Sequence, residues 1–411
     1  MHQFPVNAIH LRCQVLVHMS PHPNFFGLNV NTTAVLSKDI SNSIDNLLTQ
    51  TTENDTCTVL APASSYRPHK NIRHDLIFHP SWASNITLAS LGGYESKPLA
   101  FRAFNNAAIL GDSGVVIDDK GRFVEETLVA IKYRDPEMLW IKNFVLHRTV
   151  PGQVMTTPCL FSNHGDYAVF GHFLLETMVS VFAIRPLIDS GSLKLVMPQA
   201  RLLWRQELLA SAGLQHDKYS QINRGVTKFS RLIVSNSTSG SCTFSPNPMT
   251  LKFAEHFRRL VTINPKKHRI FITRSGAQTT SKRNLRNEHQ IITALIPFGF
   301  IAIEPGMLSF AEQVQLFANA EVVIGLHGSA FTNVIFAPNN CVVGEILPDY
   351  WASKGGAWIG NLTNICNLQY FYMIAKSKEV SGGYEVEIDV DVVVDRIRQL
   401  GGLIRMGDKP S

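Results

Sequence analysis

The feature that most constrains the fold of this 411-residue chain is a regular alternation of short apolar runs and amphipathic segments. The runs of strand length lie at 269–273, 300–303, 322–324 and 342–346. The segments of helical spacing between them lie at 288–295 and 309–318. Strands and helices that alternate at this spacing predict a doubly wound parallel sheet. Ligands of such sheets bind at the carboxyl ends of the strands.

One stretch within this alternation, Glu321–Phe336, predicts a strand, a tight turn and a helix. The turn consists of the small residues Gly328, Ser329 and Ala330. Small residues there let a ligand approach the first N–H groups of the helix, where the dipole favours an anion such as a phosphate. His327 is then expected at the mouth of an anion site. The alternative is an ordinary connection whose small residues only permit close packing.

Three polar side chains lie at or near the carboxyl ends of predicted strands, namely Arg274, His327 and Glu345. Because the carboxyl ends of parallel strands share one edge of a sheet, we expect these residues to converge on one crevice. A carboxylate at the position of Glu345 could accept hydrogen bonds from ribose hydroxyls. Alternatively, Glu345 is an ion-pair partner of Arg274 with no role in ligand binding.

A second candidate pair, His172 and Glu176, follows Gly171 in a segment whose apolar positions fit a helix. Residues four apart project from the same helical face. An imidazole beside a carboxylate has a fixed orientation and a raised pKa, which suits a general base. The alternative is a pair that only stabilises the start of a helix. A metal site is disfavoured, because no third ligand follows at helical spacing.

The basic residues are unevenly distributed in a chain whose formal net charge is +6. Between Glu255 and Glu288 there are nine Lys or Arg residues and no acidic residue, which predicts an anionic partner, although a solvated face is the alternative. No nucleic-acid-binding motif accompanies this block, so nucleic acid is not expected as a partner.

Neither a membrane-spanning helix nor a secretory signal is predicted from the sequence. The six cysteines include no C-x-x-C pair, and a cytoplasmic location is expected. Two further patterns are expected to be decoys. Asp389-Val390-Asp391 predicts a helix N-cap rather than a metal-binding D-x-D, and the Ser329 turn lacks the flanking glycines of a hydrolase elbow.

Assembled in chain order, these segments resemble the family 61 glycosyltransferases over about residues 100 to 375. The matching elements are Gly171–Glu176, Ile270–Arg274 with Arg283, Asn287-Glu288, Glu312-Gln313, His327–Asn333, and Glu345-Ile346 with Pro348. The chain departs from the usual pattern at Ala330, where a second glycine is common, and at Phe331, where leucine is common.

The resemblance implies a GT-B arrangement, in which two Rossmann-like domains face a cleft, and the sequence adds a small β-rich meander before them. The expected divisions are a poorly readable region at 1–99, the meander with an acceptor-side α/β domain at 100–250, a nucleotide-sugar-binding α/β domain at 251–376, and a strand and helix tail at 377–411.

The resemblance also implies an inverting, metal-independent transfer of a sugar from a nucleotide-sugar donor, expected to be UDP-linked, to a glycan or lipid-linked glycan acceptor. No cofactor is expected beyond this substrate. A pathway of bacterial capsular or other exopolysaccharide synthesis is expected, with peripheral contact to the inner membrane face. The alternatives are a non-catalytic nucleotide- or glycan-binding protein and a sugar-nucleotide hydrolase or epimerase.

The expected catalytic residues are His172 as the base and Glu176 as its assistant, although Glu176 itself is the alternative base. Arg274 and the turn amides of Gly328 and Ser329 would stabilise the leaving group, with further help from Arg283 and His327. Thr332 and Glu345 would contact ribose or base. The remaining expected donor-binding residues are Asn287 and Asn333.

Overall fold

The computed structural model describes residues 57–61, 64–66, 70–83, 88, 94–110, 114–128, 153–162, 169–199, 202–222, 225–239, 246–265, 267–274, 283–353, 356, 358–380 and 383–401. The chain divides into two compact units. The carboxyl-terminal unit contains the described residues of Arg67–Tyr94 and Ala254–Ser411, and the amino-terminal unit contains those of Phe26–Tyr66 and Glu95–Phe253.

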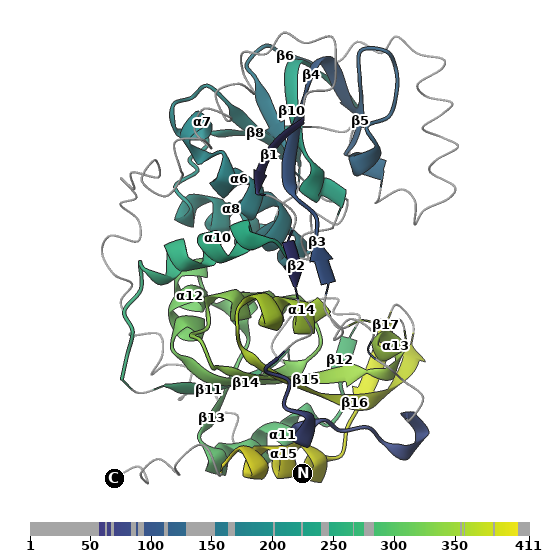
Figure 1. Ribbon diagram of the computed structural model, residues 1–411, viewed down its shortest axis with the longest axis vertical. Helices are drawn as coiled ribbons and strands as arrows, with labels where there is room; N and C mark the ends of the chain where they lie inside the picture. Colours follow the sequence, from purple (N-terminus) through teal and green to yellow (C-terminus); the bar gives the residue numbers. More distant parts are fainter. Residues whose placement is uncertain are drawn as a thin grey trace, which may run out of the picture. The chain divides into compact units, whose positions relative to one another are not determined.

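The carboxyl-terminal unit is built on a seven-stranded sheet in the order β12-β17-β16-β15-β14-β11-β13 (Figure 1). Its strands are β11 (His268–Ile272), β12 (Arg283–Leu285), β13 (Phe300–Ile303), β14 (Ala320–Leu326), β15 (Val342–Pro348), β16 (Gln369–Val380) and β17 (Gly383–Glu387). All neighbours are parallel except β16 and β17. The parallel sheet predicted from the alternation is therefore confirmed.

The order of the central strands places a topological switch point between β11 and β14. From β11 the chain first forms the short strand β12 at the far edge of the sheet and then β13 on one side of β11, whereas from β14 it continues to β15 on the other side. At such a point the two connections leave the carboxyl ends in opposite directions and open a crevice for ligands. Gly325 of β14 lies tightly against β11, because a Cβ there would be 2.9 Å from the Ile272 carbonyl oxygen.

Helices cover both faces of this sheet, with α11 and α15 on one face and α12 and α14 on the other (Figure 1). Their bounds are α11 (Glu288–Leu295), α12 (Phe310–Ala318), α14 (Trp358–Ile365) and α15 (Val390–Leu400), and shorter elements are η10 (Ile296–Phe298), η11 (Pro305–Met307), η12 (Ser329–Phe336) and α13 (Asp349–Ala352). Ser309 and Glu312 form a capping box at α12, and Asp389 caps α15 as predicted.

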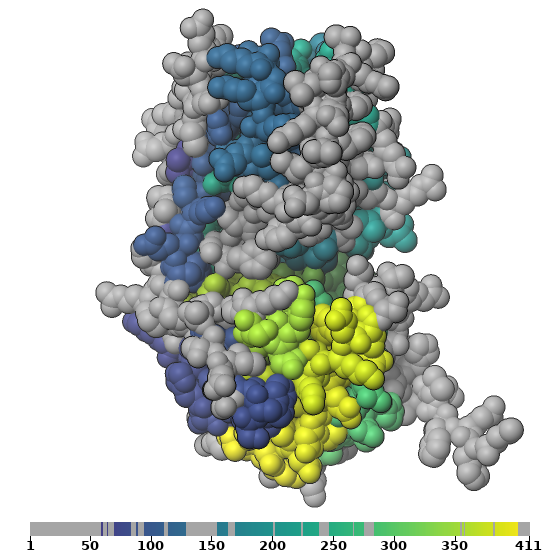
Figure 2. Space-filling view, turned by 90° about the vertical axis from the view of Figure 1, so that its right-hand side faces the viewer, coloured from purple at the N-terminus to yellow at the C-terminus, as the bar shows by residue number. Residues whose placement is uncertain are grey.

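An early segment of the chain, residues 70–83, belongs to this carboxyl-terminal unit. It contains η3 (His74–Leu76) and η4 (Ser81–Ala83), and it forms isolated parallel bridges to β16 between Ile72 and Tyr370 and between Phe78 and Met373. Figure 2 shows the dark-blue atoms of this region lying against the yellow atoms of the C-terminal elements. The sequence offers no local pattern that predicts this long-range pairing.

The amino-terminal unit contains a mixed eight-stranded sheet in the order β1-β4-β10-β7-β8-β9, with β5 beside β4 and β6 beside β10. The strands are β1 (Cys57–Ala61), β4 (Leu99–Leu110), β5 (Val115–Ile117), β6 (Gln153–Met155), β7 (Cys159–Phe161), β8 (Lys194–Pro198), β9 (Tyr219–Ile222) and β10 (Val226–Ser235). A separate two-stranded sheet pairs β2 (Ser64–Tyr66) with β3 (Tyr94–Ser96).

The predicted hairpin between residues 108 and 117 exists, because β4 and β5 are antiparallel. However, β4 lies inside the large sheet and pairs with β10 over nine register positions from Phe101 to Leu110. The predicted meander is therefore part of this sheet and does not form a separate layer before it.

The helical elements of this unit are η7 (Glu125–Leu128), α5 (Phe170–His172), η8 (Phe173–Met178), α6 (Val179–Ala183), α7 (Arg185–Asp189), α8 (Leu203–Ser211), η9 (Asn236–Ser239) and α10 (Pro248–Arg258). Helix α10 crosses the boundary between the units at residues 253 and 254. The α/β class is confirmed in both units, whereas the facing arrangement of two Rossmann-like domains stays a prediction.

Candidate functional site

Two arginines meet at the switch point of the carboxyl-terminal unit. Arg274 follows the carboxyl end of β11, and Arg283 begins β12. A Cβ built on Gly328, just after β14, would lie 1.8 Å from Arg274 Nη2 and 3.5 Å from Arg283 Nη1. The guanidinium of Arg274 therefore occupies the space that a side chain at position 328 would fill, and only glycine permits this approach.

The surroundings of Arg274 disfavour its charged form. Burial, followed by the positive charge of Arg283, lowers the pKa of Arg274 from its ordinary value, despite the weaker attraction of Glu288 and Glu304. Burial also raises the pKa of Glu288, which accepts hydrogen bonds from Thr273 Oγ1 at 2.7 Å and from the Arg274 amide at 3.3 Å. A bound anion would offset both effects that lower the pKa of Arg274, its burial and the positive charge of Arg283.

Aromatic rings hold the Arg283 guanidinium in position. Its Cζ atom lies 5.4 Å from the ring centroid of Trp351 and 5.9 Å from that of Tyr384, both within cation–π range. Trp351 in turn donates its indole N–H to the Tyr384 hydroxyl. Arg283 also donates from Nη1 to the His327 carbonyl oxygen at 3.5 Å, which links it to the turn.

His327 itself is buried beneath the turn, with 1% of its side chain exposed, rather than at the mouth of the site as the sequence suggested. Its Nδ1 contacts Glu345 Oε1, and its Nε2 accepts a hydrogen bond from Trp358 Nε1 at 3.2 Å. The second carboxylate oxygen of Glu345 accepts from the Tyr370 hydroxyl. Because an indole nitrogen can only donate, Nε2 must accept, and the hydrogen on the imidazole is assigned to Nδ1.

Glu345 lies further inside the sheet than expected, because β15 continues to Pro348 instead of ending beside it. Its side chain has no solvent exposure, and its two oxygens are engaged by His327 and Tyr370 rather than by Arg274. The alternative ion pair with Arg274 is not among these hydrogen bonds, and the contact with ribose stays a prediction.

The turn after His327 continues into a 3₁₀-helix, η12, rather than the predicted α-helix. Its first helical hydrogen bond runs from the Phe331 amide to the Gly328 carbonyl, so the amides of Ser329 and Ala330 precede it. Thr332 and Asn333 are fully buried. The Thr332 hydroxyl donates to the Ser329 carbonyl at 2.7 Å, so it braces the turn from within.

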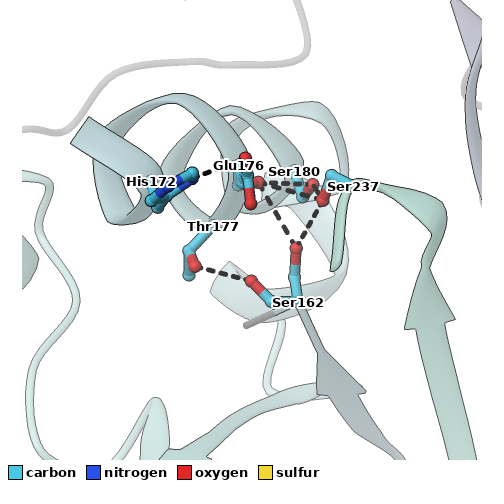
Figure 3. Close-up of polar contacts among 6 residues, drawn as sticks. All are labelled: Ser162, His172, Glu176, Thr177, Ser180 and Ser237. Carbon is cyan, nitrogen blue, oxygen red and sulfur yellow. Dashed lines mark hydrogen bonds and ion pairs between the residues drawn. The ribbon is translucent and has the colours of Figure 1, made fainter. Parts of the chain in front are cut away.

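The second candidate pair lies in the amino-terminal unit, where His172 Nδ1 and Glu176 Oε1 are 3.0 Å apart (Figure 3). The predicted helical spacing is confirmed, but η8 is a π-helix that interrupts the α-helical path between α5 and α6. π-Helical turns are rare and often occur at functional sites. His172 is 15% exposed and Glu176 is fully buried, so His172 is the member of the pair that reaches solvent.

Serine hydroxyls converge on the backbone of this π-helical turn. The Glu176 carbonyl accepts hydrogen bonds from Ser180 Oγ at 2.7 Å, Ser237 Oγ at 3.2 Å and Ser162 Oγ at 3.3 Å (Figure 3). The three serines are fully buried and come from three different segments. Sequence reasoning missed them, because Ser162 and Ser237 are far from Glu176 in the chain and share no local pattern with it.

Comparison with known families now bears on both clusters. Residues 170–344 match the family described as glycosyltransferase 61. The matched stretch, residues 170–344, is similar to glycosyltransferase family 61 and is named the family 61 domain. The matched residues include all the candidate positions from His172 to Asn333, and Glu345 lies one residue beyond them.

The chain is also similar to part of a chicken (Gallus gallus) protein, the EGF domain-specific O-linked N-acetylglucosamine transferase. The two are 28% identical over 95 residues. This similarity covers 19% of the present chain and 18% of the length of the chicken protein. Both comparisons are with proteins of the glycosyltransferase class.

Three arginines of the basic block, which lies within the family 61 domain, form ion pairs with glutamates. Arg259 pairs with Glu255, Arg269 with Glu321, and Arg286 with Glu385 and Glu387. Of the residues in this block, Arg274 and Arg283 are the two that the structure brings to Gly328.

Asn287 is also placed near the start of α11, where its Nδ2 donates to the Ile388 carbonyl at 2.6 Å. It lines a separate surface hollow of about 380 Å³ together with Arg286, His289, Gln290 and Glu387. Within the family 61 domain, this residue therefore joins α11 to the chain before α15. Its predicted donor contact stays a prediction.

Two kinds of feature are absent from the described residues. None of the helices there is long and apolar enough to cross a membrane. No group of three or more His, Cys, Asp or Glu side chains in those residues is arranged to hold a metal ion.

Proposed function

We propose that this chain is a glycosyltransferase that moves a sugar from a nucleotide-sugar donor to a hydroxyl group of a glycan acceptor. The family 61 domain and the similarity to an N-acetylglucosamine transferase support the class of reaction. The observation that carries the donor site is the pair of guanidinium groups around Gly328 at the switch point between β11 and β14.

The arginine pair suits the departing nucleoside diphosphate. Transfer of the sugar leaves negative charge on the β-phosphate oxygens, and preorganised cations and amides stabilise such developing charge. Burial and the positive charge of Arg283 disfavour the charged form of Arg274. A bound diphosphate would offset both effects, because its negative charge attracts both guanidinium groups. The amides of Ser329 and Ala330 precede the first hydrogen bond of η12, so they add N–H donors that also favour an anion.

A transfer to a hydroxyl group also needs a base that removes the proton of the acceptor. We assign His172 as the general base and Glu176 as its partner, because Nδ1 faces the carboxylate and leaves the reaction to Nε2. The base takes the hydroxyl proton, the acceptor oxygen forms a bond to the anomeric carbon, and the bond from that carbon to the diphosphate oxygen breaks. A single displacement of this kind inverts the configuration.

His327, Glu345 and Thr332 take positioning roles in this scheme rather than direct contact with the donor. All three are buried, and their hydrogen bonds support the turn that opens the approach to Gly328. The positive charge for the leaving group then comes from arginine, and we expect no requirement for a divalent metal.

The name of the chicken relative makes UDP-N-acetylglucosamine the first donor to test. The expected bacterial polysaccharide pathway, lipid-linked acceptor, contact with a membrane surface and cytoplasmic location stay predictions from the sequence.

Calorimetric titration with UDP, GDP and CMP, with and without EDTA, tests the donor site. We expect one nucleotide to bind with an affinity that EDTA does not change and that Arg274→Ala abolishes. Arg259→Ala is the matched control, because Arg259 belongs to the same basic block but is 74% exposed and paired with Glu255. Absence of binding by every nucleotide would sink the donor-site assignment.

Transfer assays then separate the alternatives. Binding without turnover towards any acceptor would favour a non-catalytic binding protein, and release of the sugar without an acceptor would favour a hydrolase.

A further inference from the structure

The sequence suggested Thr332 and Glu345 as the residues that contact the base and ribose of the donor. Thr332 and Glu345 are both fully buried, and their polar atoms are used within the protein. Groups that bind the nucleoside must instead be exposed and must lie on the same carboxyl edge of the sheet as Arg274 and Arg283.

Short helix α13 meets both conditions, because it begins at the carboxyl end of β15, the strand next to β14. Tyr350 on α13 is 46% exposed. The helix is held in place by Asp349, whose Oδ1 accepts hydrogen bonds from the amides of Tyr350 and Ser377, both at 2.9 Å. The exposed ring is therefore presented from an anchored element.

The ring of Tyr350 lies beside the two aromatic rings that hold Arg283. Its centroid lies 5.4 Å from Trp351 and 5.9 Å from Tyr384. These are the same two rings that hold the Arg283 guanidinium. A nucleoside diphosphate presents a flat aromatic ring at one end and two phosphates at the other, which matches an exposed ring beside two cations.

We propose that Tyr350, backed by Trp351 and Tyr384, forms the subsite on which the nucleobase of the donor stacks. This inference rests on the proposed donor site and adds the position of its base. Stacking on a tyrosine recognises the flat face that all nucleobases share. The subsite therefore contributes affinity for nucleotides over bare phosphates and does not by itself choose between bases.

Calorimetry with UDP and with inorganic pyrophosphate tests the inference, because pyrophosphate carries the two phosphates without a base. Base stacking is worth about 1–3 kcal/mol by alanine substitution, so we expect Tyr350→Ala to weaken UDP binding by about tenfold or more. Pyrophosphate affinity should not change. Tyr350→Phe keeps the ring and should bind UDP like the unsubstituted protein.

Trp82→Ala is the matched control, since Trp82 is another exposed aromatic residue of the same unit, 51% exposed, and should leave both ligands unaffected. Equal weakening of UDP and pyrophosphate by Tyr350→Ala, or no weakening of either, would overturn the stacking subsite while the anion site stands. If neither ligand binds the unsubstituted protein, the donor site fails and the subsite fails with it.

Discussion

Trp358 donates its indole N–H to Nε2 of His327 at 3.2 Å, while Nδ1 of the same imidazole contacts Glu345. The ring is thus held between an obligate donor and a carboxylate, and Trp351 lies with its centroid 5.6 Å away. This arrangement explains how a histidine next to two arginines is accommodated in a buried site.

The first prediction concerns the tautomer of His327. With Trp358 donating to Nε2, the hydrogen should reside on Nδ1, and long-range ¹H–¹⁵N NMR correlation distinguishes the two nitrogens. Trp358→Phe keeps an aromatic ring but removes the donor, and we expect it to cost about 1 kcal/mol of unfolding free energy. A hydrogen found on Nε2 in the unsubstituted protein would contradict the assigned network.

The second prediction is a loss of stability at alkaline pH through Tyr370. Burial, followed by the charge of Glu345, raises its pKa well above 10 in the folded protein. Above pH 10 the unfolded chain has released this proton while the folded chain retains it, so the free energy of unfolding falls as pH rises. Each pH unit in this window costs up to about 1.4 kcal/mol.

Urea denaturation between pH 9 and pH 11 can measure this slope, about one unit either side of the ordinary tyrosine pKa. Tyr370→Phe should flatten it, while Tyr372→Phe should flatten it less, because burial alone raises the pKa of Tyr372, whereas the charge of Glu345 raises that of Tyr370 further. Identical slopes for Tyr370→Phe and the unsubstituted protein would show that Tyr370 is not the responsible group.

The third prediction uses the close approach at the turn. Gly328→Ala places a methyl group 1.8 Å from Arg274 Nη2, and the end of that flexible side chain can move aside without unfolding the protein. We therefore expect nucleotide and pyrophosphate affinity to fall by about tenfold or more with little change in melting temperature, since a displaced charge-assisted contact is worth about 1.5–3 kcal/mol. Gly306→Ala, where a Cβ meets nothing within 4 Å, is the control. Unchanged nucleotide and pyrophosphate affinity in Gly328→Ala would show that Arg274 is not part of the anion site.

The fourth prediction separates chemistry from donor binding. His172→Ala removes the proposed base, so transfer should fall by about 10²- to 10⁴-fold while UDP binding is retained. Glu176→Gln keeps the shape of the side chain but removes its charge, and it should lower turnover without abolishing it. Full turnover by His172→Ala would move the base to another residue.

The elements that sequence patterns predicted best are those governed by neighbouring residues. Strand β13 lies at the predicted residues 300–303, and Asp389 caps α15 as its position before an apolar helical pattern indicated. The spacing of His172 and Glu176 is equally local, and the structure places their side chains together. In each case the deciding interactions are made within a few residues of the chain.

Predictions failed where distant strands decide the outcome. Glu345 was expected near a strand end, but β15 extends to Pro348 because Leu347 and Pro348 pair with Ile374 and Ala375 of β16. The π-helical turn at Glu176 is supported by Ser162 and Ser237, which no local pattern connects to it.

The sequence by itself determined the alternation of strands and helices, the small-residue turn at Gly328 and the candidate side chains at the strand ends, because apolar periodicity and backbone freedom are local properties. Only the tertiary structure decided that Arg274 and Arg283 meet at Gly328 and that His327 is buried between Trp358 and Glu345. It also decided that Tyr350 is exposed beside Trp351 and Tyr384. These relationships depend on which strands become neighbours and on the burial that results. Those outcomes are set by the packing of the whole unit rather than by any one segment.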